Sequence, residues 1–154
     1  MIFRPGSIGA LMDEYERAAR DMKAVLSNVT EAEYHAVVDP NPNLDSIRTM
    51  MTHVINSGYG YATYVSKALG TPIDRPKVET VSYAEVIPLI DSILKFTDDV
   101  LKPHYLMPED DMDTITMTSP WKVVYSIDQM LEHAVCHVLR HRRQVEKYVG
   151  RMRE

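Results

Sequence analysis

The chain has 154 residues, the length of one ordinary domain and enough to bury a hydrophobic core. Its 45% hydrophobic and 25% charged residues have the balance of a soluble globular protein and not of a disordered chain. The formal net charge of −5 argues against a nucleic-acid partner, because phosphate binding depends mainly on Lys and Arg. We therefore expect a single domain over residues 1–154 and no nucleic-acid partner.

The expected compartment follows from the cysteine and from the lack of long apolar runs. Cys136 is the only cysteine, so no disulfide can form within the chain and a reducing compartment is the default. No stretch approaches the roughly 18 consecutive apolar residues of a membrane span. The first twenty residues lack the continuous apolar run of a signal peptide. These features favour a cytoplasmic protein without a membrane partner.

The first half of the chain predicts two long helices. Residues 7–26 and residues 44–69 both repeat apolar side chains every three or four positions, so that one face of each helix is apolar. Between them, residues 27–43 form a connector in which Thr30 and Glu33 have the spacing of a capping box. The connector should therefore contain one short helical turn.

The second half predicts two more long helices. Residues 82–101 begin with Ser82 and Glu85, the spacing of a capping box, and residues 126–151 begin with another such pair. Pro88 lies past the first turn of a helix that starts at Ser82. Since proline disrupts a helix interior, this helix either kinks at Pro88 or begins later in the chain.

Residues 102–125 form a long connection with three prolines and the acidic run 109–113. Loops of this length in compact domains are more often functional or lid-like than idle. Only residues 113–118 alternate as a strand would. For Trp121 and the acidic run we favour a solvated surface position over a role in covering a pocket.

Four amphipathic helices in one domain of this length indicate an all-α four-helix bundle. The connection over residues 70–81 spans at most about 40 Å when extended. Helices of the predicted lengths measure about 30–40 Å. The connection could therefore return the chain to the end of the bundle where the second helix began.

Histidines follow one another at intervals of four in the last helix, as His133, His137 and His141. Residues four apart project from neighbouring points of one helix face, so two such imidazoles can bind one metal ion. The first and last of the three lie about 12 Å apart along the axis and cannot share it. Spacing alone leaves the pairs His133–His137 and His137–His141 equally good.

His53 is the best third ligand, because it borders the apolar face of the second helix, whereas His35 and His104 lie in connectors. The alternative is that all these histidines are hydrogen-bonded packing residues. A metalloprotease His-Glu-x-x-His motif is absent, since Ala134 and Val138 stand where the glutamate would be. The chain also contains no Glu-x-x-His, which di-iron bundles require.

The run from His137 to Gln144, HVLRHRRQ, resembles the C-terminal signature of DinB-like (DinB/YfiT) proteins. In that signature His-x3-His is followed by Arg-Gly-Gln and an apolar residue, and here Arg143 replaces the glycine. Residues 46–54 resemble the family's second helix, which carries its metal-binding histidine. The resemblance covers essentially the whole chain, and it favours His141 over His133, which is usually not a ligand in the family.

The resemblance implies an up-down-down-up bundle, with residues 70–81 as the crossover. It also implies a zinc or nickel site formed by His53, His137 and His141, with water in the open positions, and a homodimer. Related members of the superfamily are metal-dependent transferases or isomerases that use thiols such as bacillithiol or mycothiol. Gln144 is then a candidate to fix the tautomer of a ligand. Three tyrosines follow His53 and are more typical of the core edge: Tyr59, Tyr61 and Tyr64.

Two functions from different classes are consistent with these features. The first is a metal-dependent thiol S-transferase, or a related hydrolase, that acts on a small-molecule thiol or electrophile. The second is a non-catalytic, metal-stabilised stress-response binding protein in which the histidines only hold structure.

Overall fold

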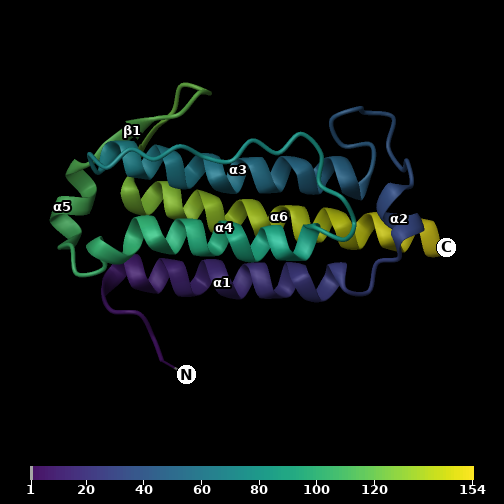
Figure 1. The fold of residues 1–154 in the computed structure, drawn as a ribbon, viewed down its shortest axis with the longest axis horizontal. Helices are drawn as coiled ribbons and strands as arrows, with labels where there is room; N and C mark the ends of the chain where they lie inside the picture. Colours follow the sequence, from purple (N-terminus) through teal and green to yellow (C-terminus); the bar gives the residue numbers. More distant parts are fainter. Residues whose placement is uncertain (1) are drawn as a thin grey trace.

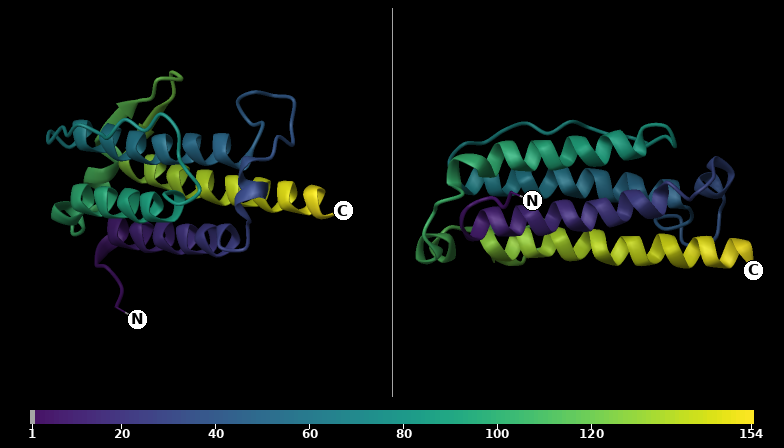
Figure 2. Two further views of the ribbon diagram at one scale, coloured as in Figure 1. Left: turned by 45° about the vertical axis from the view of Figure 1, so that its right-hand side comes forward. Right: turned by 90° about the horizontal axis from the view of Figure 1, so that it is seen from below.

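A computed structural model describes residues 2–154 as a bundle of four long helices (Figure 1). The helices α1 and α6 run in one direction, and α3 and α4 run in the other (Figures 1 and 2). The connection between α3 and α4 returns along the bundle, as predicted, and gives the up-down-down-up order (Figure 1). The bounds are α1 Gly6–Leu26, α3 Ile47–Ala68, α4 Val86–Leu101 and α6 Ile127–Arg153.

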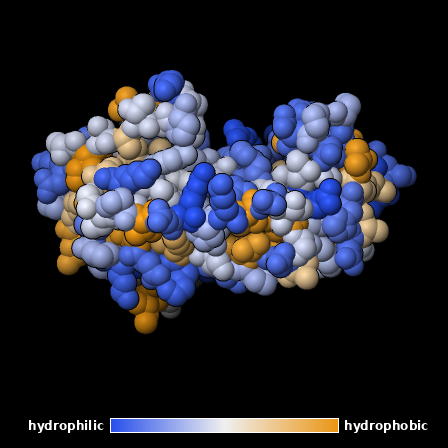
Figure 3. Space-filling view, turned by 45° about the horizontal axis from the view of Figure 1, so that its top comes forward, coloured by the Kyte–Doolittle hydropathy of each residue, from blue (hydrophilic) through white to orange (hydrophobic). Residues whose placement is uncertain are grey.

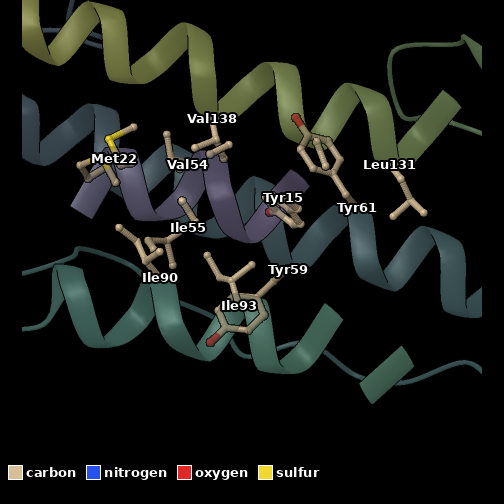
Figure 4. Packing of buried hydrophobic residues seen from close by; sticks show 14 of the residues in the cluster. Tyr15, Met22, Val54, Ile55, Tyr59, Tyr61, Ile90, Ile93, Leu131 and Val138 are labelled. Carbon is tan, nitrogen blue, oxygen red and sulfur yellow. The ribbon is translucent and has the colours of Figure 1, made fainter. Parts of the chain in front are cut away.

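The core lies along the axis of the bundle, where α1 packs against α6 and α4, and α3 packs against the same two helices. Side chains from all four helices interdigitate there (Figure 4). Methionine contributes heavily to the core, because its flexible side chain fills irregular gaps between helices. The fully buried methionines are Met12, Met22, Met50, Met51 and Met130.

Two of the capping boxes form as predicted. Thr30 and Glu33 bond reciprocally at the start of the short helix α2 (Glu31–His35). The Gln129 side chain accepts a hydrogen bond from the backbone N–H of Ser126 at 3.1 Å, at the start of α6. Each pair satisfies backbone groups that have no partner inside the helix, which is why these helices begin where the sequence predicts.

The helix α4 begins at Val86 and not at Ser82, so the predicted start is wrong by four residues. The Glu85 carboxylate accepts hydrogen bonds from the backbone N–H and the hydroxyl of Ser82, at 3.4 and 2.6 Å, and stabilises a turn ahead of the helix. Pro88 is then the third residue of α4, where an N–H would have no carbonyl partner within the helix. Of the two alternatives at Pro88, the later start is therefore the one observed.

The segment 102–125 is more ordered than a loop. It contains a 3-10 turn (Lys102–His104), the helix α5 (Glu109–Thr114) and an antiparallel hairpin of β1 (Thr116–Thr118) and β2 (Val124–Ser126). The acidic run forms most of α5, whose first turn carries three carboxylates where the helix dipole favours them. The hairpin contacts α3 and α6 and so brings Trp121 toward these helices.

Within residues 2–154, no helix is both long enough and apolar enough to cross a membrane. Hydrophilic residues cover most of the face seen in Figure 3, and the hydrophobic residues on it form small separate groups. This surface is the one that a bundle with an internal apolar core presents.

Candidate metal site and its pocket

The structure brings His53 of α3 together with His137 and His141 of α6. The Nε2 atom of His137 lies 2.9 Å from that of His53 and 3.1 Å from that of His141. Among the described residues, this is the group of His, Cys, Asp and Glu side chains whose ligand atoms could share one metal ion. The three residues predicted from the sequence and the family resemblance therefore form one cluster.

The neighbouring positions of α3 and α6 create the cluster. His53 precedes the core residues Val54 and Ile55, so its ring lies at the edge of the face that α3 turns toward α6. His137 and His141 are one helical turn apart and only 5% and 3% exposed, whereas the His53 residue is exposed. The cluster is thus anchored in the core on the α6 side and reachable from solvent on the α3 side.

The donor set fits a tetrahedral metal ion. Ligands about 2.0–2.1 Å from such an ion lie about 3.3 Å from one another, close to the two separations of 2.9 and 3.1 Å from Nε2 of His137. A neutral imidazole has one N–H and one lone pair, so three converging Nε2 atoms cannot all be satisfied by each other. The Nδ1 atom of His141 and the Oε1 atom of Gln144 are both buried without a hydrogen-bond partner among the described residues. A histidine that binds through Nε2 carries its proton on Nδ1 and needs an acceptor there, the role predicted for Gln144.

The electrostatics of the site keep these imidazoles neutral. Burial lowers the pKa of His137 to about 2, with further lowering by the neighbouring rings of His141 and His53 and by the charge of Arg140. Burial likewise lowers the pKa of His141 to about 4, against a small opposing effect of Gln144. The pKa of His53 is lowered by the partial desolvation of its ring on the side facing His137, and then by the charge of Arg140. At neutral pH all three rings are therefore unprotonated, the state in which imidazole binds metals.

An open pocket of about 440 Å³ lies beside the cluster. Two of its walls are aromatic. The Tyr61 ring stands edge-on to that of His137, with ring centroids 5.5 Å apart, and the Trp121 ring stacks on that of His133, with ring centroids 5.4 Å apart. His133 therefore belongs to the pocket wall and not to the three-histidine cluster. The lining residues are His53, Asn56, Ser57, Gly60, Tyr61, Tyr64, Arg75, Trp121, His133, His137 and Arg140.

The other predicted residues divide between pocket and core. Tyr61 and Tyr64 line the pocket, whereas Tyr59 is buried against Phe96 of α4 with ring centroids 5.1 Å apart. Trp121 is 44% exposed, as a surface residue would be, yet it also forms part of the pocket wall, the role that we did not favour. The acidic run in α5 does not line this pocket.

Sequence reasoning missed two arginines of the pocket, Arg75 and Arg140. Arg140 had a local signal, because it lies three residues after His137 and so projects from a neighbouring part of α6. Arg75 had none, since it comes from the crossover between α3 and α4, whose path depends on tertiary packing. Its guanidinium donates a hydrogen bond to the backbone oxygen of Asn56 at 3.3 Å, which holds it at the pocket edge.

Residues 14–145 match the sequence model of the DinB superfamily, a span that includes all three clustered histidines. The chain belongs to the DinB superfamily. No curated protein matches it in a comparison of sequences. Membership of the DinB superfamily agrees with the helical bundle, and with the resemblance of the run from His137 to Gln144 to the signature of the DinB-like proteins.

Proposed function

We propose that this DinB-superfamily protein binds a divalent ion, zinc or nickel, through Nε2 of His53, His137 and His141, and acts as a thiol S-transferase. The observation that supports the proposal is the convergence of three neutral imidazoles beside an open pocket that has no carboxylate in its lining. Three uncharged ligands leave the full charge of a bound ion to act on whatever occupies the pocket.

A bound ion could activate either a thiol or a water without a carboxylate base, and the resemblance to superfamily members that use thiols favours the thiol. When bound, the ion would lower the pKa of a thiol and so supply a thiolate near neutral pH, without a carboxylate base. The thiol proton would pass to solvent, and the thiolate sulfur would attack an electrophilic carbon, forming a C–S bond as a C–Cl bond or an epoxide C–O bond breaks. The electron pair leaves with chloride, or with an oxygen that takes a proton from water.

The aromatic wall supplies the binding surface for the acceptor. Tyr61, Tyr64 and Trp121 present ring faces and edges to the pocket, which suit the apolar part of a chlorinated or epoxide substrate and exclude water from it. Burial and the charge of Arg140 lower the pKa of His133, so its ring is neutral at pH 7 and can accept a proton. A related hydrolase would use His133 in this way.

The test is turnover of glutathione, bacillithiol or mycothiol with chlorinated and epoxide acceptors. We expect product only with the metal-loaded protein and at least a hundredfold less product with His137→Ala. If no pair reacts with metal present, the enzymatic proposal is contradicted.

The alternative is a non-catalytic, metal-stabilised stress-response protein, supported by the deep burial of His137 and His141 in the core. It predicts that chelation lowers the melting temperature while no small thiol alters stability or the spectrum of a cobalt-substituted site. A thiol-dependent change in that spectrum would contradict this alternative.

We further propose a cytoplasmic homodimer without a nucleic-acid partner. Light scattering should give twice the chain mass of 17.6 kDa, and a mass equal to one chain would contradict the dimer. Electrophoretic mobility of DNA at moderate salt should not change when the protein is added.

A further inference from the structure

The pocket beside the histidines has an unbalanced charge. Arg75 and Arg140 line it, and no Asp or Glu does. Arg140 directly precedes His141 on α6 and lines the pocket together with His53 and His137, so its charge lies close to the cluster. A bound divalent ion would add two more positive charges to the pocket. The described lining contains no negatively charged side chain to offset them.

A neighbouring cleft also has positively charged side chains in its lining and no negatively charged ones. A second hollow of about 610 Å³ lies under the hairpin and shares Tyr64 with the first. Its lining includes Lys67 and Lys122 and again no Asp or Glu. Four cations thus border two adjoining hollows whose linings contain no Asp or Glu, in a chain whose net charge is −5.

Six of the thirteen other Lys and Arg residues form ion pairs. Among the described residues, none of the ion pairs includes either of the pocket arginines or either of the two lysines of the cleft. The basic residues that do form ion pairs are Arg4, Arg17, Lys23, Lys95, Arg142 and Arg153. Unpaired cations in a concave site with low-dielectric walls focus the electric field and attract an anion.

We propose that this pocket binds a small molecule that carries a carboxylate, which Arg75 and Arg140 hold. The planar guanidinium matches the two oxygens of a carboxylate better than a lysine ammonium does. A volume of about 440 Å³ suits a small molecule, and Trp121 stands in the wall of the same pocket. The proposal deepens the proposed function and rests on it in one respect, since we place the carboxylate on the thiol substrate and not on the electrophilic acceptor.

Trp121 provides a direct binding signal, because it is the only tryptophan and lies in the pocket wall. The probes are 3-mercaptopropionate and 3-mercapto-1-propanol, which differ in the carboxylate, together with inorganic phosphate. Each is titrated into metal-free and zinc-loaded protein by fluorescence, with calorimetry as a second readout. We expect the acid to bind at least tenfold more tightly than the alcohol, as an ionised hydrogen bond predicts.

The variants are Arg140→Gln and Arg75→Gln, with Arg143→Gln as the matched control. Arg143 is an exposed arginine of α6 that does not line the pocket. We expect each pocket variant to reduce the preference for the acid about tenfold, and the control to keep it. Arg140→Lys should recover only part of the preference, because it restores the charge without the planar fork.

The outcomes separate this proposal from the proposed function. Equal binding of acid and alcohol to zinc-loaded protein would overturn the carboxylate proposal while the metal site stands. A preference for the acid in protein that binds no zinc would uphold the carboxylate pocket and contradict the metal-dependent transferase. Phosphate that binds as tightly as the acid, with the same loss in Arg140→Gln, would overturn the carboxylate in favour of a phosphate ligand.

Discussion

Burial sets the protonation state of the three clustered imidazoles. Because His137 and His141 are almost fully buried, adding a proton to either ring places a charge in the core beside other imidazoles. The same burial leaves their lone pairs free at neutral pH. A site of this kind favours a metal cation over protons as the positive charge that the rings surround.

Depressed histidine pKa values have a consequence for metal-free protein. A group whose pKa is about 6.5 unfolded and about 4 folded, as at His141, binds fewer protons in the folded state below pH 6.5. The contribution of this group to the free energy of unfolding is therefore fully present above pH 6.5, and it is lost as the pH drops toward 4. The expected loss from His141 is roughly 1–2 kcal/mol at about pH 5.

Urea unfolding of metal-free protein between pH 7.5 and 4.5 measures this loss. The variant His141→Gln should lose less stability over the same range, because it lacks this imidazole. Protonation of carboxylates affects both proteins equally and cancels in the comparison. Parallel pH profiles of wild type and variant would show that the imidazole is not held neutral by burial.

At the scale of elements, Gly58 sets how closely α3 approaches α4. A Cβ atom there would lie 2.7 Å from Cγ2 of Ile93 and 3.2 Å from the Tyr15 hydroxyl. The cost of glycine in a helix, about 1 kcal/mol relative to alanine, is thus offset by close packing in the core. The reason for this glycine is tertiary and is not visible in the helical pattern.

We expect Gly58→Ala to lower the free energy of unfolding by up to about 2 kcal/mol, since overpacking costs about 1–3 kcal/mol and helix propensity returns about 1. Gly150→Ala is the matched control, because a Cβ there meets no atom within 4 Å. The control should stabilise α6 by up to about 1 kcal/mol. Thermal unfolding of both variants tests the pair, and stabilisation of both would refute the close approach of α3 and α4.

The elements that the sequence predicts well are those with local causes. Periodic apolar residues and the capping box of Thr30 with Glu33 act within a few residues of the chain, and the helices that they predict are present. The alternation over residues 113–118 marks β1 alone, and its pairing with β2 could not be predicted in this way, because contacts with α3 and α6 hold the hairpin. The start of α4 depended on whether the Ser82–Glu85 pair caps the helix itself or stabilises a turn ahead of it. The three-residue spacing of the pair is the same in both cases.

On the scale of the whole molecule, the histidine cluster links α3 to α6 across 84 residues of sequence. The fourth helix alone left two histidine pairs open, and only the packing of α3 against α6 brings His53 to one of them. The pocket wall was less predictable, because Arg75 and Trp121 reach it from the crossover and the hairpin. Long-range packing, and not local pattern, determined those positions.

A metal ion that bridges two helices should stabilise the folded state. Binding to the folded chain alone adds about 2.7 kcal/mol when the free metal is a hundredfold above its dissociation constant. In a domain of this size the melting temperature should fall by about 5–10 °C when the ion is chelated. Scanning calorimetry with EDTA, followed by zinc in excess, measures the loss and its recovery, and an unchanged melting temperature would argue against a bridging ion.

The central claim is the three-histidine metal site, and metal analysis of purified protein tests it most directly. Plasma emission spectrometry of the wild type should give about one zinc or nickel ion per chain. His53→Ala, His137→Ala and His141→Ala should each lose the ion, whereas His133→Ala should keep it. Loss of the ion in His133→Ala together with its retention in His141→Ala would contradict the account and move the ligand pair one turn earlier in α6.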